Sequence, residues 1–184
     1  MGKKSLENKI ARKFIVDSRN NGITDQEIYH ELSQQYFDKH EIALLITGTV
    51  KPENKSRYKI YNNVLLGLSG FFILFKLFIT TNLIIQNEGQ LSTHLLVLTF
   101  VLLFAGIMFM VAKYDGQSYR VGGILAISFF CQIIAHSANG IDILISTSIA
   151  SIIAGLLFFL DKKLFPDYHP RKMKQDSNGE YILG

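Results

Sequence analysis

The sequence predicts an all-α protein: a polytopic four-helix transmembrane bundle preceded by an N-terminal cytosolic three-helix module. Three observations predict it. Hydrophobic residues make up 48% of the 184-residue chain and the mean hydropathy is +0.22, which is high for a soluble domain, and the apolar residues are concentrated after position 60. The preceding residues are polar and repeat apolar side chains at helical spacing. Basic residues flank alternate apolar runs. We therefore expect three segments: 1–57, 58–160 and a basic tail, 161–184.

The first segment opens with one amphipathic helix. Leu6, Ile10 and Phe14 recur every four residues, with Ala11 and Ile15 beside them, so they form one apolar stripe. The Asn-Asn-Gly sequence at 20–22 then predicts a break in the helix.

Two further helices of this segment are marked by capping signals. Thr24 and Glu27 have capping-box spacing, and Asp38 and Glu41 repeat it. The apolar faces expected for the two helices are Ile28, Leu32 and Tyr36, and then Ile42, Leu45 and Ile46. Gly48 and Pro52 are expected to end the third helix, and 51–59 is expected to be a polar, basic connector.

The pattern GIT..EI...L, followed by a short third helix, resembles helix-turn-helix and ubiquitin-associated-like three-helix modules over about 30 residues. A DNA reader would carry Arg, Asn or Gln for base edges on its third helix. Residues 38–49 offer Lys39 and His40 and then apolar side chains, so no nucleic-acid partner is expected. The resemblance favours a protein-interaction module, and the alternative is a small cap packed near the first span.

Four transmembrane helices are expected at about 60–81, 91–112, 119–137 and 141–160. The third apolar core, Val121 to Ala135, is short for a ~30 Å hydrocarbon layer, which needs ~20 residues. It is still expected to span, because a basic loop precedes it and another span follows. The charged first residues do not resemble a cleavable signal peptide, so the first run is expected to stay in the membrane.

The distribution of basic residues predicts the orientation. Lysine and arginine are abundant before the first span, in the loop between the second and third spans, and in the tail, and they are absent from the other two loops. Such a bias marks the cytosolic side. We expect a multi-pass protein of the bacterial cytoplasmic (inner) membrane with both termini cytosolic. The tyrosines expected at the same interface agree with this orientation: Tyr58, Tyr61, Tyr114, Tyr119 and Tyr168.

The tail carries Pro166, Pro170 and an Asn178-Gly179 turn ahead of Tyr181. Its sequences KKLFPDY and DSNGEYIL resemble the tails of small uncharacterised bacterial membrane proteins, and this resemblance implies no function. Three arrangements are open: the tail lies back on the amino-terminal module, binds anionic lipid headgroups through its basic residues, or is extended and solvated.

Four ionisable residues are expected together near the outer end of the spans: Lys76, His94, His136 and Asp142. Ionisable groups inside a membrane are costly and are candidates for function. Lys76 either extends its stem toward water or lines an internal polar path. The other three either bind a divalent cation or relay protons, or are interfacial side chains in contact with water. Extension toward water is favoured for Lys76, and contact with water at the interface is favoured for the other three, so no metal site is expected.

Small residues predict a helix-packing face, and a polar pore lining in an oligomer is the alternative. Its members are Gly67, Gly70, Ser148, Ser151 and Gly155.

The sequence contains no GxSxG, HExxH or P-loop motif, so catalysis is not favoured and no cofactor is expected. Cys131 is the single cysteine, which excludes an internal disulfide. The leading expectation is a non-catalytic scaffold or docking protein of the inner membrane that acts through its cytosolic module and tail. Its partners would be the lipid bilayer and either a cytosolic protein or its own copies. The alternatives are a small oligomeric channel or transporter subunit, and a membrane enzyme or metal site at the outer face.

Overall fold

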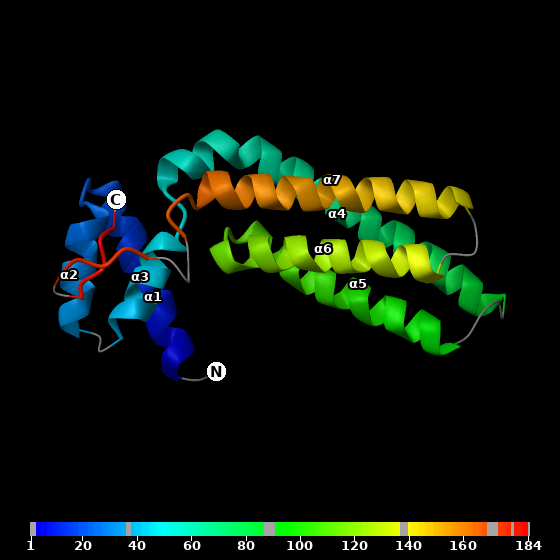
Figure 1. The fold of residues 1–184 in the computed structure, drawn as a ribbon, viewed down its shortest axis with the longest axis horizontal. Coiled ribbons are helices and arrows are strands. Elements are labelled where there is room, and N and C mark those ends of the chain that lie inside the picture. The colour runs from blue at the N-terminus through cyan, green and yellow to red at the C-terminus, as the bar shows by residue number, and fades with distance from the viewer. Residues whose placement is uncertain are drawn as a thin grey trace. The chain divides into compact units, whose positions relative to one another are not determined.

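The computed structural model describes residues 3–35, 38–86, 91–136, 140–168, 173–177 and 179–183 (Figure 1). Side chains are described for these residues except 3–8, 35, 93, 130–136 and 140–142. The described residues form seven helices and no strand, which confirms the all-α class. The helices are α1 (Lys3–Asn20), α2 (Asp25–Gln35), α3 (Lys39–Thr47), α4 (Pro52–Ile85), α5 (Leu91–Ala112), α6 (Gly116–His136) and α7 (Gly140–Leu164).

The chain divides into two compact units. One comprises Met1–Tyr58 together with Lys162–Gly184, and we call it the terminal unit. The other comprises Lys59–Asp161, and we call it the bundle.

Helix α1 buries a different stripe from the one predicted. Ala11, Ile15 and Ser18 are buried, whereas Ile10 is 58% exposed and Phe14 is half-buried. The side chain of Leu6 lies outside the described residues. The predicted stripe was wrong by about one residue around the helix, because Ala11 and Ile15 were placed at its edge and not at its centre. Helices α2 and α3 pack on the Ala11–Ile15 side, which periodicity alone does not specify.

The predicted helix ends of the terminal unit are largely confirmed. Gly22 has a φ of +80°, a conformation that suits glycine, and ends α1. The Thr24 N–H and hydroxyl donate to the Glu27 carboxylate at 2.8 and 2.7 Å, and the Glu27 N–H donates back to the Thr24 hydroxyl at 3.3 Å. Asp38 accepts from the Glu41 N–H at 3.0 Å and caps α3. These bonds satisfy amides that a helix start leaves unpaired.

Pro52 was expected to end α3, and this was wrong: it is the first residue of α4. The expected basic connector at 51–59 is therefore mostly helical. Proline suits this position, because its fixed φ is helical and the N–H it lacks would have had no partner in the helix. The first helical hydrogen bond, from the Lys55 N–H to the Lys51 carbonyl at 3.0 Å, follows immediately.

The core of the terminal unit joins all three amino-terminal helices to the tail. Its buried residues are Ile15, Ile28, Tyr29, Leu32, Ile42, Ala43, Ile46 and Leu183. Of the three arrangements considered for the tail, the structure has the packed one, since Leu183 is only 9% exposed.

Three helices among the described residues are long and apolar enough to cross a membrane, not the four predicted. These are α4, α5 from His94 and α7 from Ile143. The side chains described for α6 run only from Gly116 to Phe129, which is short of the ~20 residues that a bilayer needs. The three helices are compatible with a multi-pass membrane protein.

Candidate functional site

Four of the six buried residues of α4 are polar. The six recur at helical spacing: Asn62, Leu65, Ser69, Phe72, Lys76 and Thr80. Residues three and four apart lie above one another on a helix, so polar side chains follow one line through the interior of the bundle. Buried polar groups inside an apolar bundle are the natural candidates for a site.

At one end of this line, a hydrogen-bonded group ties three helices together. The buried Tyr119 hydroxyl of α6 donates to the Asn62 side-chain oxygen of α4 at 2.7 Å and lies 3.2 Å from the Val111 carbonyl oxygen of α5. The next residue of α6, Arg120, pairs with Asp161 of α7 at 3.1 Å. All of these partners come from different helices, so this end of the bundle is held by directional polar contacts.

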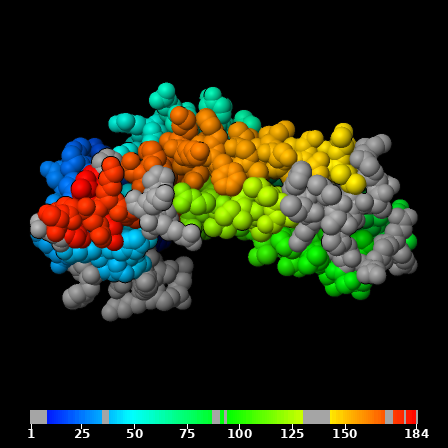
Figure 2. All heavy atoms as spheres, viewed as in Figure 1, coloured from blue at the N-terminus to red at the C-terminus, as the bar shows by residue number. Residues whose placement is uncertain are grey.

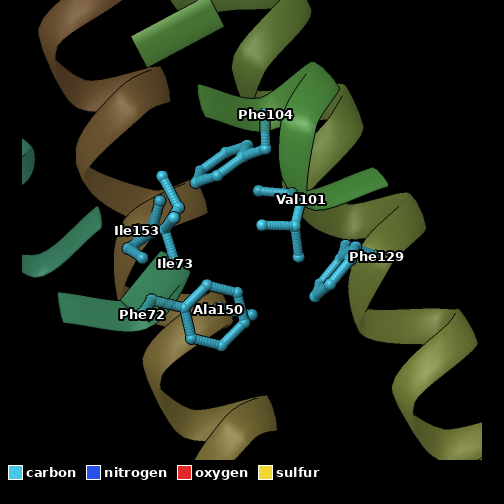
Figure 3. Close-up of a pocket in the computed structure, with 8 residues that line it drawn as sticks. Phe72, Ile73, Val101, Phe104, Phe129, Ala150 and Ile153 are labelled. Carbon is cyan, nitrogen blue, oxygen red and sulfur yellow. The ribbon is translucent and has the colours of Figure 1, made fainter. Parts of the chain in front are cut away.

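An apolar layer interrupts the line. All four helices contribute to a cavity of about 10 Å³, which is close to the volume of a single water-sized sphere. The Phe72 and Phe129 rings meet edge to face there, with centroids 5.6 Å apart. Figure 3 shows the side chains converging on the cavity, whose lining is Phe72, Ile73, Val101, Phe104, Ala126, Phe129, Ala150 and Ile153. A space so small and so apolar stays dry and gives polar solutes no path through a single chain.

Lys76 and His94 lie beyond this layer and are both buried, at 5% and 8% exposure. The Lys76 ammonium lies 5.9 Å from the centroid of the Phe75 ring. The side chain of Lys76 is enclosed by the protein, and its extension toward water stays a prediction. The buried position favours the internal alternative.

The predicted outer-end group is tested only in part. The side chains of His136 and Asp142 lie outside the described residues, as does that of Cys131, so the structure does not test whether they converge with Lys76 and His94. Among the side chains that are described, no three His, Cys, Asp or Glu residues lie close enough to hold a metal ion.

The small residues predicted to pack helices face outward in this chain. A Cβ added at Gly67, Gly70 or Gly155 would meet no atom within 4 Å. Ser148 and Ser151 are exposed and donate to carbonyls of their own helix, at 2.7 and 2.8 Å. Helix packing through these residues would require a second chain.

Close helix packing inside the bundle depends on a pair that the sequence reasoning did not assign to packing. A Cβ at Gly122 would lie 3.1 Å from the Ile107 side chain of α5, and a Cβ at Gly123 would lie 2.8 Å from the Phe158 ring of α7. The glycine doublet in the middle of an apolar run was the available signal, since small residues let helices approach.

Sequence reasoning also missed Arg19, which joins all three helices of the terminal unit. Its guanidinium binds both carboxylate oxygens of Asp25, at 2.7 and 3.1 Å, and donates to the carbonyls of Thr49 and Ile46, at 2.6 and 2.9 Å. The side chain is only 6% exposed. A single residue thereby links the end of α1, the start of α2 and the end of α3. Such a role depends on tertiary contacts, and no local spacing signals it.

The tail adds a set of contacts on α2 and α3. The Gln26 side-chain amide of α2 bonds to the backbone of Tyr181 and Leu183, and His40 of α3 lies 2.9 Å from the Tyr181 hydroxyl. Figure 2 shows tail atoms, in red, beside the blue and cyan atoms of the amino-terminal helices. The sequence predicted the polar turn of the tail and its Tyr-Ile-Leu end. It did not predict that they bind to α2 and α3.

No protein-family model, no curated protein and no solved structure matches this chain.

Proposed function

We propose that this protein is a non-catalytic docking protein of the bacterial inner membrane that recruits a protein partner through its terminal unit. In this proposal α6 is a fourth span and both termini are cytosolic. The observation that carries the proposal is the ordered face on α2 and α3, where a segment far away in sequence is held by backbone, apolar and charged contacts.

The apolar packing at the centre of the bundle also supports this proposal. Its centre is a dry apolar layer, so a single chain has no continuous polar route along α4. The polar end at Asn62 is occupied by hydrogen bonds within the protein.

Affinity capture from native membranes tests the docking function. The full chain is compared with a chain that begins at Lys51 and with a Lys76→Leu variant. We expect a specific set of proteins to be captured by the full chain, to be lost without residues 1–50, and to be retained with Lys76→Leu. Capture of the same set without residues 1–50 would contradict the proposal.

Labelling with a membrane-impermeant maleimide tests the orientation. In a Cys131→Ser background, single cysteines are introduced as Ser92→Cys, at the exposed start of α5, and Ser177→Cys, in the exposed turn of the tail. With both termini cytosolic, intact spheroplasts are labelled at position 92 and not at position 177, and permeabilised ones are labelled at both. The reverse pattern would place the termini outside.

The second candidate is a subunit of an oligomeric channel or transporter. The polar line on α4 favours it, because Ser69, Lys76 and Thr80 are buried in a segment that is otherwise apolar. Purified protein in liposomes would then pass ions or small solutes, and Lys76→Leu would change the flux. An absence of flux with protein that retains its helix content would exclude this candidate.

A further inference from the structure

We propose that the face formed by α2 and α3 is a peptide-recognition site, and that the tail, Met173–Leu183, is its ligand in cis. The partner is an extended protein segment in which an acidic residue precedes a tyrosine, a variable residue and a leucine. This inference rests on the proposed docking function and names the class of partner that displaces the tail.

The site binds the backbone of an extended segment through hydrogen bonds. The Gln26 side chain donates to the Tyr181 carbonyl at 3.2 Å and accepts from the Leu183 N–H at 2.9 Å. One amide group thereby pairs with two backbone groups on the same edge of the segment, as a neighbouring strand would. Contacts to backbone give affinity that is independent of side-chain identity, and the side chains between them give specificity.

Two side chains anchor the segment. Leu183 is 9% exposed and joins the core made by the three helices. The Tyr181 ring lies between Tyr29, with centroids 6.3 Å apart, and His40, with centroids 5.5 Å apart. Ile182, between the two anchors, is 55% exposed, so the site places no demand on that position. The pattern of anchor, free position and anchor is that of an extended peptide.

The charge preference comes from basic side chains at the rim. Glu180 lies 3.5 Å from the Lys39 ammonium and 3.8 Å from the His30 ring nitrogen. These three side chains are between 34% and 52% exposed, so water and salt screen their attraction. The rim therefore selects an acidic residue without binding it tightly, which suits an exchangeable ligand.

Hydrogen bonds within the tail hold it in one conformation, so it can bind to the site and dissociate from it as a unit. Gly179, with a φ of +75°, closes a turn in which the Asp176 N–H donates to the Glu180 carbonyl at 2.8 Å. The Ile182 N–H then donates to the Lys174 carbonyl at 3.0 Å. These bonds lie within the tail and are not lost on release. The contacts that must be broken include those at Met173, Glu180, Tyr181 and Leu183.

Two observations indicate that the tail does not use the whole site. The Tyr29 hydroxyl is buried and has no hydrogen-bond partner among the described residues, although its ring lies against Tyr181. An open groove of about 780 Å³ also begins at Leu183 and continues between α1, α2 and the start of α4, past Arg19, Thr24, Gln26 and Pro52. A longer foreign segment would fill this groove and bind more tightly than the tail.

A second copy of this chain does not offer the same gain. Exchanging tails between two copies reproduces the same contacts and adds the entropic cost of association. The site therefore favours a segment from a different protein.

The test uses the purified chain in lipid nanodiscs and a fluorescent peptide with the sequence of residues 173–184. A chain that ends at Lys172 is expected to bind the peptide saturably. The full chain is expected to bind it at least about tenfold more weakly, because a tethered tail competes at a high effective concentration. Anisotropy titration measures both.

Variants on each side locate the binding. Leu183→Ala or Tyr181→Ala in the peptide is expected to weaken binding about tenfold or more, as loss of a buried anchor does. Glu180→Gln is expected to weaken it by only about two- to fivefold, as loss of an exposed ion pair does. In the shortened chain, Gln26→Ala is expected to weaken binding. The matched control Gln34→Ala removes the same type of side chain from an exposed position of α2 and is expected to leave binding unchanged.

Three outcomes would overturn the proposal. One is an absence of binding to a shortened chain that keeps its helix content. Another is equal binding to the full and shortened chains, which would place the peptide elsewhere. The third is loss of helix content both in the shortened chain and in full-length Leu183→Ala, which would make the tail an integral part of the core. A failure of the membrane capture experiment with intact peptide binding would instead contradict the docking function and leave the site in place.

Discussion

The two units of this protein use their buried polar residues in opposite ways. In the terminal unit, Arg19 sits where three helices meet and every contact it makes joins one helix to another. In the bundle, the polar residues of α4 are separated by the apolar layer around Phe72 and Phe129. The terminal unit is small, so a modest apolar core is supplemented by polar links. The bundle has apolar side chains on both its inside and its outside, so its polar groups are exceptions that lock particular helix pairs.

The largest effect that tests this comparison is expected from Arg19→Met. It removes the two-pronged partner of Asp25, which keeps the Lys51 ammonium at 3.6 Å, and the partner of the Ile46 and Thr49 carbonyls. Breaking a buried charge pair costs about 3–5 kcal/mol. Hydrogen–deuterium exchange is expected to rise in α1–α3 and to stay unchanged in the bundle. Lys13→Met, at an exposed position of the same helix, is the control. Faster exchange throughout the bundle as well would show that the two units unfold together.

Gly123→Leu is the corresponding disruption of the bundle. Its side chain would meet the Phe158 ring, and overpacking of this kind costs about 1–3 kcal/mol. Gly155→Leu adds the same side chain to α7 where nothing lies within 4 Å, and is expected to be neutral in a single chain. Thermal unfolding in detergent measures both. Equal destabilisation would contradict the packing described for Gly123 or reveal a second chain at Gly155.

Asn62→Leu tests whether polar groups lock the helices of the bundle. It removes the nearer acceptor of the Tyr119 hydroxyl and leaves the Val111 carbonyl at 3.2 Å, and loss of one such hydrogen bond costs about 1 kcal/mol. Tyr119→Phe in the same chain is expected to restore part of the loss, because both partners are then apolar. The four proteins form a double-mutant cycle whose coupling energy is the measured quantity. Additive losses would mean that the bond contributes nothing specific.

The smallest effect is expected from the cap of α2 and depends on pH. Hydrogen bonds from the Thr24 hydroxyl and backbone lower the pKa of Glu27. The ionised form is thus favoured by folding, and its contribution is complete above the unfolded pKa and lost as the pH falls through the lowered folded pKa. Glu27→Gln is expected to be less stable than the natural chain at about pH 7 and to match it at about pH 2. Urea unfolding measures the difference, and a constant difference would exclude the titration.

Local patterns predicted the elements well. Gly22, the Thr24–Glu27 capping box and Asp38 each act through residues a few positions away. Their effects on the helix ends can therefore be predicted from the sequence alone. The prediction for Pro52 was wrong because proline is common both just after the end of a helix and at the first position of the next helix. The face of α1 was misread because the neighbours of Ala11 and Ile15 come from α2 and α3.

What the sequence alone determined is the helical class, the capped helix starts of the terminal unit and a chain with long apolar helices compatible with a membrane. These follow from periodicity, capping chemistry and hydrophobicity, which act along the chain. Only the tertiary structure decided that Lys76 points inward, that Gly122 and Gly123 are contact positions, and that Leu183 enters a core more than a hundred residues away in sequence. The reason is that each of these depends on which side chains from distant segments meet. Such contacts leave no pattern in the neighbouring residues of a single sequence.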